Sequence, residues 1–157
     1  MTAPHSTERA AAIVDVHILL ADRSGRLLLG LRQNTGFADG CWHLPAGHLE
    51  DEETLTEAVV REAREELGVA VDQAATEFVH LMHEPGRVAT FFLVRRWRGT
   101  PTNMEPTKCA ALEWFALDGG LPEPMVPYCH DALHSIVTGQ SFSQYGWRRP
   151  GSSERAA

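Results

Sequence analysis

The chain has 157 residues, 43% of them hydrophobic, and a formal net charge of −7. A chain of this length can form one globular domain that buries roughly two thirds of its unfolded surface, so it needs neither disulfides nor a structural metal to fold. Its three cysteines are odd in number and share no short metal-binding spacing, which indicates reduced thiols in a cytoplasmic protein. With no secretory leader pattern and no long apolar run, we expect no contact with a membrane.

The negative charge is concentrated in one segment. Residues 47–66 contain eight acidic residues against two arginines, a local balance of −6, whereas the rest of the chain has 13 acidic and 12 basic residues. This distribution argues against a broad basic face for duplex nucleic acid. If the substrate is itself an anion, a positive group must mediate its binding to this segment.

The first part of the chain alternates between apolar runs and turn-rich segments. Residues 13–20 (IVDVHILL) and 26–32 (RLLLGLR) predict two strands, and the turn-forming ADRSG between them predicts a hairpin. Residues 34–40 (NTGFADG) are typical of a loop.

A helix is predicted at residues 55–67 because both of its ends carry signals. Thr54 is a good N-cap, and Glu57 three residues later completes a capping box. Gly68 stands where a helix commonly ends in the left-handed conformation.

The second half of the chain alternates in the same way. Residues 77–83 and 87–97 predict two long strands around a tight turn at Pro85-Gly86. A shorter strand is predicted at residues 112–117, and apolar positions at helical spacing predict a helix at residues 127–138.

These elements indicate one domain at residues 10–147. The two ends, residues 1–9 and 148–157, are small and polar, so we expect them to be flexible. Mixed strands with two helices and no linker between them are typical of an α/β or α+β sandwich.

The stretch REAREELGV places three carboxylates at the C-terminal end of the predicted helix. Glu62, Glu65 and Glu66 are three and four residues apart, and like charges at that spacing repel by roughly a few tenths of a kcal/mol per pair. One interpretation is a solvated face on which Arg61 pairs with Glu57 and Glu65, which leaves the other two glutamates stacked. The other is a divalent cation held by the carboxylates, since hard cations take oxygen ligands.

The residues around this stretch match a longer pattern. Residues 47–69 follow G-x5-E-x7-R-E-U-x-E-E-x-G-U, in which U is aliphatic, with seven fixed identities and a small Ala63 at one aliphatic position. The chain therefore resembles the Nudix hydrolase family, whose box has this pattern. The resemblance covers about residues 12–139 and implies that family's single-domain α/β/α sandwich with a mixed β-sheet.

The resemblance also implies a metal-dependent hydrolase that splits a nucleoside diphosphate linked to another group, using Mg²⁺ or Mn²⁺ and an attacking water. By match to the box, Glu65 and Glu66 would be metal ligands, and Glu62 would be a further ligand or the group that deprotonates or orients the water. The main-chain carbonyl of Ala46, the residue before the box glycine, would bind metal as well.

Three more box residues have implied supporting roles. Arg61 would fix the catalytic carboxylates by pairing with them, and Glu53 would support them from nearby. Gly47 would leave space for a close backbone approach to the substrate, or it forms a left-handed turn before the acidic loop. The chemistry is consistent with these roles, because a phosphoanhydride with several negative charges repels hydroxide unless a cation neutralises it.

Candidates outside the box have two interpretations each. Glu105 is an extra metal ligand or base, or a plain loop acid. Arg32 is interpreted either as a phosphate-contacting residue or as an exposed arginine at the end of a strand. Phe37, Trp42 and Trp114 stack on a base, or they belong to the core, as such aromatic residues more often do.

The substrate is indicated only by weaker similarities. The stretch NMEPTKCAALEWFAL and the following GGLPEP resemble a segment of Nudix enzymes that hydrolyse nucleoside triphosphates, including oxidised purine forms, to monophosphate and pyrophosphate. Pro85 lies near the place where ADP-ribose-cleaving relatives carry a proline, although a tight turn explains it equally well.

Two classes of function stay open at this point. The first is a metal-dependent diphosphatase acting on a nucleoside triphosphate, with ADP-ribose or a related nucleotide sugar as the alternative substrate. The second is a Nudix-like module that binds a nucleotide without cleaving it. The four intact box glutamates favour the enzyme. We expect a small-molecule nucleotide and no nucleic acid as partner, and a homodimer is left open.

Overall fold

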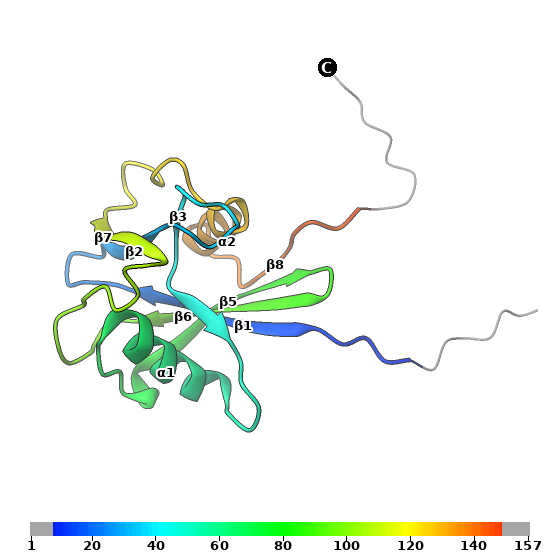
Figure 1. Ribbon diagram of the computed structural model, residues 1–157. Coiled ribbons are helices and arrows are strands. Elements are labelled where there is room, and N and C mark those ends of the chain that lie inside the picture. The colour runs from blue at the N-terminus through cyan, green and yellow to red at the C-terminus, as the bar shows by residue number, and fades with distance from the viewer. Residues whose placement is uncertain (1–7, 149–157) are drawn as a thin grey trace, which may run out of the picture.

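The computed structural model describes residues 8–148, and its strands form two sheets with two α-helices packed on them (Figure 1). The strands are β1 (Ile13–Leu20), β2 (Leu27–Arg32), β3 (Trp42–His43), β4 (Ala46–His48), β5 (Thr76–Glu84), β6 (Arg87–Val94), β7 (Cys109–Phe115) and β8 (Phe142–Gln144). The helices are α1 (Leu55–Leu67) and α2 (Pro127–Val137), and a 3-10 turn, η1, spans Gln73–Ala75. The ends expected to be flexible, 1–9 and 148–157, lie outside the described residues apart from 8, 9 and 148.

The larger sheet is mixed and has the strand order β4-β1-β6-β5-β8. Strand β1 runs parallel to β6 along its whole length, from Ile13 opposite Arg87 to Leu20 opposite Val94, and antiparallel to β4. The smaller sheet, in the order β3-β2-β7, is antiparallel. Within residues 8–148, no helix is long and apolar enough to cross a membrane.

The predicted hairpin of the first two strands is wrong. The turn between them does form, since the Asp22 carboxylate accepts hydrogen bonds from the backbone of Ser24 and Arg26, but β1 and β2 lie in different sheets and share only the bridge between Ala21 and Leu27. Both edges of β1 are already occupied by β4 and β6. A strand that is buried on both faces, such as β1, has a nearly continuous apolar sequence. That sequence does not show which distant strands will pair with it.

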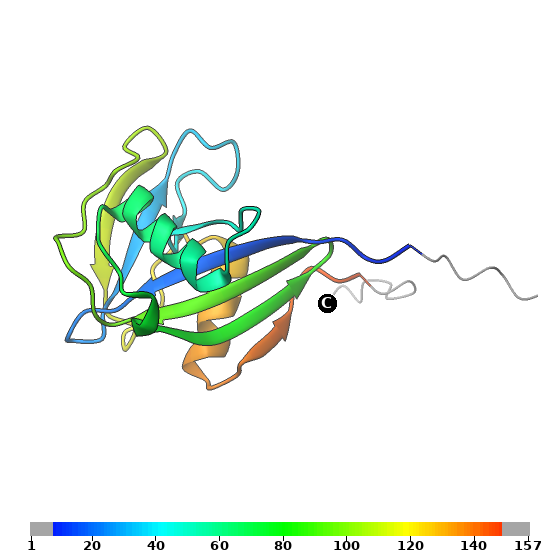
Figure 2. The ribbon, with the colours of Figure 1, turned by 90° about the horizontal axis from the view of Figure 1, so that it is seen from below.

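The two helices cover opposite faces of the larger sheet (Figure 2). Because side chains of a strand alternate between faces, Val16, Ile18 and Leu20 of β1 pack in the cluster under α1, whereas Leu19 and Ala21 pack in the cluster under α2. The predicted α/β/α sandwich with a mixed sheet is therefore confirmed.

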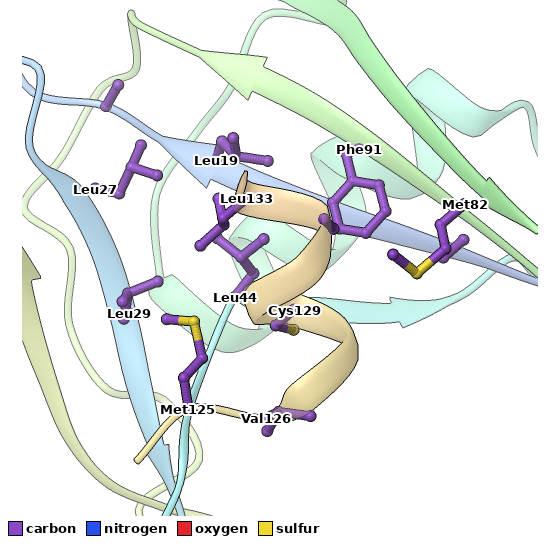
Figure 3. Packing of buried hydrophobic residues seen from close by; sticks show 13 residues of the cluster. Leu19, Leu27, Leu29, Leu44, Met82, Phe91, Met125, Val126, Cys129 and Leu133 are labelled. Carbon is purple, nitrogen blue, oxygen red and sulfur yellow. The ribbon is translucent and has the colours of Figure 1, made fainter. Parts of the chain in front are cut away.

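The cluster under α2 also joins the two sheets. Figure 3 shows Cys129 and Leu133 of α2 packed among Leu29 of the smaller sheet and Phe91 of the larger one. Phe91 and Leu133 are both 0% exposed, so the inner surface of α2 is fixed against the sheet. This packing sets where the first turn of α2 stands relative to β1 and β5.

Most of the other predicted elements are present with small differences at their ends. The strands expected at 77–83 and 87–97 are β5 and β6, and β6 ends earlier, at Val94; the strand expected at 112–117 is β7, which begins at Cys109. Helix α2 ends at Val137, one residue before its expected end. The sequence patterns did not predict β3, β4 and β8, which have only two or three residues each and therefore show no periodicity.

Helix α1 has the predicted bounds and the predicted capping box. The Thr54 hydroxyl accepts a hydrogen bond from the Glu57 backbone at 3.3 Å, and the Glu57 carboxylate accepts one from the Thr54 backbone at 2.7 Å. Gly68 is left-handed, with φ 66°.

Because the capping hydrogen bonds lie outside the cavity described below, we expect Thr54→Ala to lower the free energy of unfolding by about 1 kcal/mol and leave turnover unchanged. Denaturant unfolding and steady-state rates measure both effects, with Thr54→Ser, which keeps the hydroxyl, as control; a large loss of turnover would contradict the assignment.

Candidate active site

A cavity of about 850 Å³ lies where β4, α1 and the smaller sheet meet. Its walls come from segments far apart in the sequence, including β1, β2, β4, α1 and the segment before β7. The volume lies within the range of about 300–1,000 Å³ that is common for small-molecule sites. Nine of the predicted site residues line it: Arg32, Phe37, Ala46, Gly47, Arg61, Glu62, Glu65, Glu66 and Glu105.

Helix α1 presents three of these carboxylates side by side, and we call Glu62, Glu65 and Glu66 the carboxylate ridge. Their spacing in the helix places them on the surface that faces the cavity. Glu62 is only 7% exposed, whereas the Glu65 side chain is 56% exposed. A carboxylate oxygen of Glu66 accepts a hydrogen bond from the Ala46 backbone at 3.2 Å, which ties the ridge to β4.

Arg61 holds the carboxylates through several contacts at once. It donates two hydrogen bonds to Glu53, at 2.6 and 3.0 Å, one to Glu62 at 2.6 Å and one to the His48 carbonyl at 2.9 Å. A longer contact of 3.3 Å reaches Glu65. These carboxylates raise the pKa of the Arg61 guanidinium above its usual value, with the hydrogen bonds to Glu53 as the main cause.

The solvated-face interpretation of this helix is therefore only partly right. Arg61 contacts Glu65 as that interpretation expects, but its other partners are Glu53 and Glu62, and Glu57 is bound by the cap residue instead. Glu53 is itself fixed, because one of its oxygens accepts a hydrogen bond from the Glu50 backbone at 2.8 Å. The structure thus brings Arg61, Glu53 and Glu62 together as the box resemblance implied.

Gly47 is required by close approach and not by its backbone conformation. A Cβ atom at this position would lie 1.8 Å from a Glu62 carboxylate oxygen, and the φ angle of Gly47 is not positive. The left-handed turn considered for Gly47 is therefore wrong. The absent side chain leaves the room that the Glu62 carboxylate occupies.

We expect Gly47→Ala to lower turnover at least about tenfold, because the added methyl group would push Glu62 away from Arg61. The matched control is Gly119→Ala, since a Cβ at Gly119 would meet nothing within 4 Å and its φ is not positive either. Steady-state rates and melting temperatures of both variants measure the effect. Wild-type turnover in Gly47→Ala would show that Glu62 does not need its observed position.

The ridge is electrostatically crowded. Burial, followed by the charges of Glu62 and Glu105, raises the pKa of Glu66 to about 8. Burial also raises the pKa of Glu62, against the opposite effect of Arg61. Crowded carboxylates with raised pKa values favour a proton or a cation at this place.

This crowding predicts how the stability of the metal-free protein depends on pH. Since the pKa of Glu66 is about 8 in the folded protein and 4.5 is its ordinary value, the folded state binds the proton more tightly, and stability is lost as pH rises toward 8. We expect the melting temperature in a chelator to fall between pH 6.5 and 8.5, and to fall less in Glu66→Gln. Equal slopes in the two proteins would contradict this role of Glu66.

Glu105 reaches the cavity through contacts of its loop with the end of α1. The backbone N–H groups of Thr102 and Met104 donate to the carbonyls of Leu67 and Glu66, at 2.9 and 3.1 Å. These bonds satisfy carbonyls that a helix end otherwise leaves free. Glu105 therefore lines the cavity beside the ridge, with Lys108 at 4.0 Å from it.

The oxygen atoms gathered here suit a hard divalent cation. Glu62, Glu65, Glu66 and Glu105 line one cavity, as does Ala46, whose carbonyl was the predicted main-chain ligand. Among residues 8–148, no three His, Cys, Asp or Glu side chains are already arranged around one common metal position. One carboxylate oxygen of Glu62 accepts a hydrogen bond from Arg61 and one of Glu66 accepts from the Ala46 N–H, so each side chain has a second oxygen that could ligate a cation.

The candidates for binding the substrate separate into two groups. Arg32 and Phe37 line the cavity, and Arg32 is held in place by a hydrogen bond of 2.8 Å to the Phe37 carbonyl, with its guanidinium 5.6 Å from the Phe37 ring centre. Trp42 is not among the cavity-lining residues, because its ring packs at 4.7 Å against Phe115 at the edge of the core. Trp114 similarly packs against another aromatic ring beside the core, and neither tryptophan lines the cavity.

Several polar residues of the cavity were not predicted. The signal that could have found two of them is the presence of Asp15 and His17 inside the apolar run IVDVHILL, since polar residues in a buried strand need partners or a function. No comparable signal marked the others. The unpredicted lining residues used below are Asp15, His17, Glu84, Arg87, Lys108 and Tyr128.

Known proteins are similar to this chain in sequence and in fold. The NUDIX domain family matches residues 12–132. An 8-oxo-dGTP diphosphatase of Proteus vulgaris is 34% identical over 87 residues, which cover 54% of this chain and 77% of that protein. A CTP pyrophosphohydrolase of Escherichia coli strain K12 is 27% identical over 117 residues, 73% of this chain and 84% of that protein.

Solved structures agree with these relatives. A MutT NUDIX hydrolase from Burkholderia pseudomallei matches with a TM-score of 0.70 and 33% identity, over 81% of this chain and 98% of that chain. By its fold and its relatives, the chain is thus a pyrophosphohydrolase of the Nudix type. The chain belongs to the Nudix hydrolase family.

Proposed function

We propose that this protein is a divalent-metal-dependent diphosphatase that hydrolyses a nucleoside triphosphate, oxidised purine forms included, to monophosphate and pyrophosphate. The observation that carries the proposal is the carboxylate ridge at a cavity large enough for a nucleotide. The names of the two similar proteins, an 8-oxo-dGTP diphosphatase and a CTP pyrophosphohydrolase, support this substrate class.

The proposed metal is Mg²⁺, with Mn²⁺ as the substitute. Glu65, Glu66 and the Ala46 carbonyl would hold it, with Glu105 as a further ligand from outside the helix. When bound, such a cation neutralises phosphate oxygens and makes water a better nucleophile. The raised pKa of Glu66 supports this assignment, because a cation relieves the same repulsion that the proton relieves.

The chain's own residues would position the reactants. Glu62, a ligand or the general base, is fixed by Arg61, and Arg61 is fixed by Glu53. A base held within hydrogen-bonding reach of the attacking water can take its proton as the phosphoanhydride breaks. Arg32 and Lys108 are cationic side chains that line the cavity and can contact phosphate oxygens of the substrate.

A nucleotide panel tests the proposal. Purified protein is incubated with Mg²⁺ and 8-oxo-dGTP, dGTP, CTP or ADP-ribose, and the phosphate products are separated. We expect monophosphate and pyrophosphate from a triphosphate, and no turnover when a chelator is present. Cleavage of ADP-ribose alone would support the alternative substrate class, and binding without turnover across the panel would contradict the proposed function.

A further inference from the structure

The cavity has a second polar end, on the other side of the β4 edge from the carboxylate ridge. Strand register places its residues on one face of the larger sheet, because Asp15 pairs with Ala89, His17 with Phe91 and Glu84 with Arg87. Ala89 and Phe91 belong to the cluster under α2, so these side chains lie on the α2 face. We call this part, lined by Asp15, His17, Glu84, Arg87 and Tyr128, the α2 end of the cavity.

Two buried polar atoms at the α2 end have no hydrogen-bond partner among the described residues, namely Glu84 Oε2 and His17 Nδ1. His17 is 1% exposed and cannot turn to solvent, because its ring stacks on Phe91 at 4.5 Å between centres and its Nε2 lies 3.1 Å from the Tyr128 hydroxyl. Buried polar groups are nearly always paired, and those left unpaired in a cavity point to a ligand. Both residues line the cavity that contains the ridge.

Within the described residues, the Glu84 carboxylate has no ion pair because the arginine opposite it is used elsewhere. Arg87, directly across from Glu84 in the β5–β6 pair, makes its ion pair with Asp15. Asp15 also contacts His48, so one of the two acids has an arginine and a histidine as partners and the other has no ion pair within residues 8–148. Burial accordingly raises the pKa of Glu84. The carboxylate needs hydrogen-bond donors that the described chain does not supply.

We propose that Glu84 determines base specificity by accepting hydrogen bonds from the edge of a guanine-type base bound at the α2 end. This inference rests on the proposed function, since the phosphates of the same nucleotide would lie at the ridge. Guanine presents two adjacent donors, N1–H and the 2-amino group, to the two oxygens of a carboxylate. Cytosine and adenine place an acceptor nitrogen beside their amino donor, and that nitrogen would face a carboxylate oxygen. His17 and Tyr128, which contact each other, line the same end of the cavity.

The test compares two nucleotides that differ only in the 2-amino group, dGTP and deoxyinosine triphosphate. We expect wild-type kcat/KM to be at least about tenfold higher for dGTP, since a site built to bind a donor discriminates against the analogue without it. Glu84→Gln should bring this ratio close to one at an unchanged melting temperature. Glu77→Gln, an exposed acid on the same strand that does not line the cavity, is the matched control and should keep the wild-type ratio.

The outcomes separate the two proposals. A wild-type ratio that persists in folded Glu84→Gln, or a wild-type preference for cytosine nucleotides, overturns the role of Glu84 while the proposed function stands. If no nucleotide is turned over, the proposed function fails, and calorimetric binding of dGMP against deoxyinosine monophosphate in a chelator still tests the α2 end. Equal affinities of the two monophosphates would overturn the inference, and tighter binding of dGMP would support it.

Discussion

Glu66→Gln is expected to lower turnover at least about a hundredfold while leaving the fold intact. Glutamine keeps the size of the side chain and an oxygen that can accept from the Ala46 backbone, but it loses the charge that the proposed cation requires. Because the Glu66 carboxylate is crowded in the folded protein, its neutral replacement should not lower the melting temperature of the metal-free protein.

Steady-state kinetics at several Mg²⁺ concentrations measure this effect, since a lost ligand raises the concentration needed for half-maximal activity as well as lowering the rate. Glu113→Gln is a suitable control, because Glu113 is an exposed acid on β7 that does not line the cavity. Near-normal activity of Glu66→Gln would remove Glu66 from the catalytic site.

Arg61→Ala is expected to lower turnover about a hundredfold and the free energy of unfolding by about 1–3 kcal/mol. Removing the guanidinium would leave Glu62, which is 7% exposed, without its cationic partner. It would also deprive Glu53 of two hydrogen bonds. Without the guanidinium, the pKa of Glu62 should rise further, because burial already raises it against the effect of Arg61. A protonated Glu62 can neither bind a cation nor accept a proton.

The dependence of kcat/KM on pH distinguishes this mechanism from a general loss of packing. In Arg61→Ala, the acidic limb of the profile should move to higher pH, whereas simple destabilisation would lower the rate without moving the limb. Arg64→Ala on the same helix is the control, since Arg64 is exposed and does not line the cavity. An unchanged profile in Arg61→Ala would indicate that Glu62 does not titrate in the rate-limiting step.

Local signals explain which elements could be predicted. Helix α1 was predicted with its bounds because Thr54, Glu57 and Gly68 mark its ends through contacts within a few residues. The box residues were predicted as a group for a related reason, since helical spacing alone places Glu62, Glu65 and Glu66 together. The β1–β2 hairpin was predicted wrongly because strand pairing depends on segments far away in the sequence, here β4 and β6.

By itself, the sequence determined the family, the acidic helix and its ends, since these depend on residue identity and short spacing. Only the tertiary structure decided that Glu105 meets the ridge, that Trp42 packs in the core and that Glu84 and His17 share the cavity with it. Those outcomes depend on strand order and on the competition of side chains for buried partners. That competition leaves Arg87 with Asp15 and not with Glu84, and no local pattern encodes it.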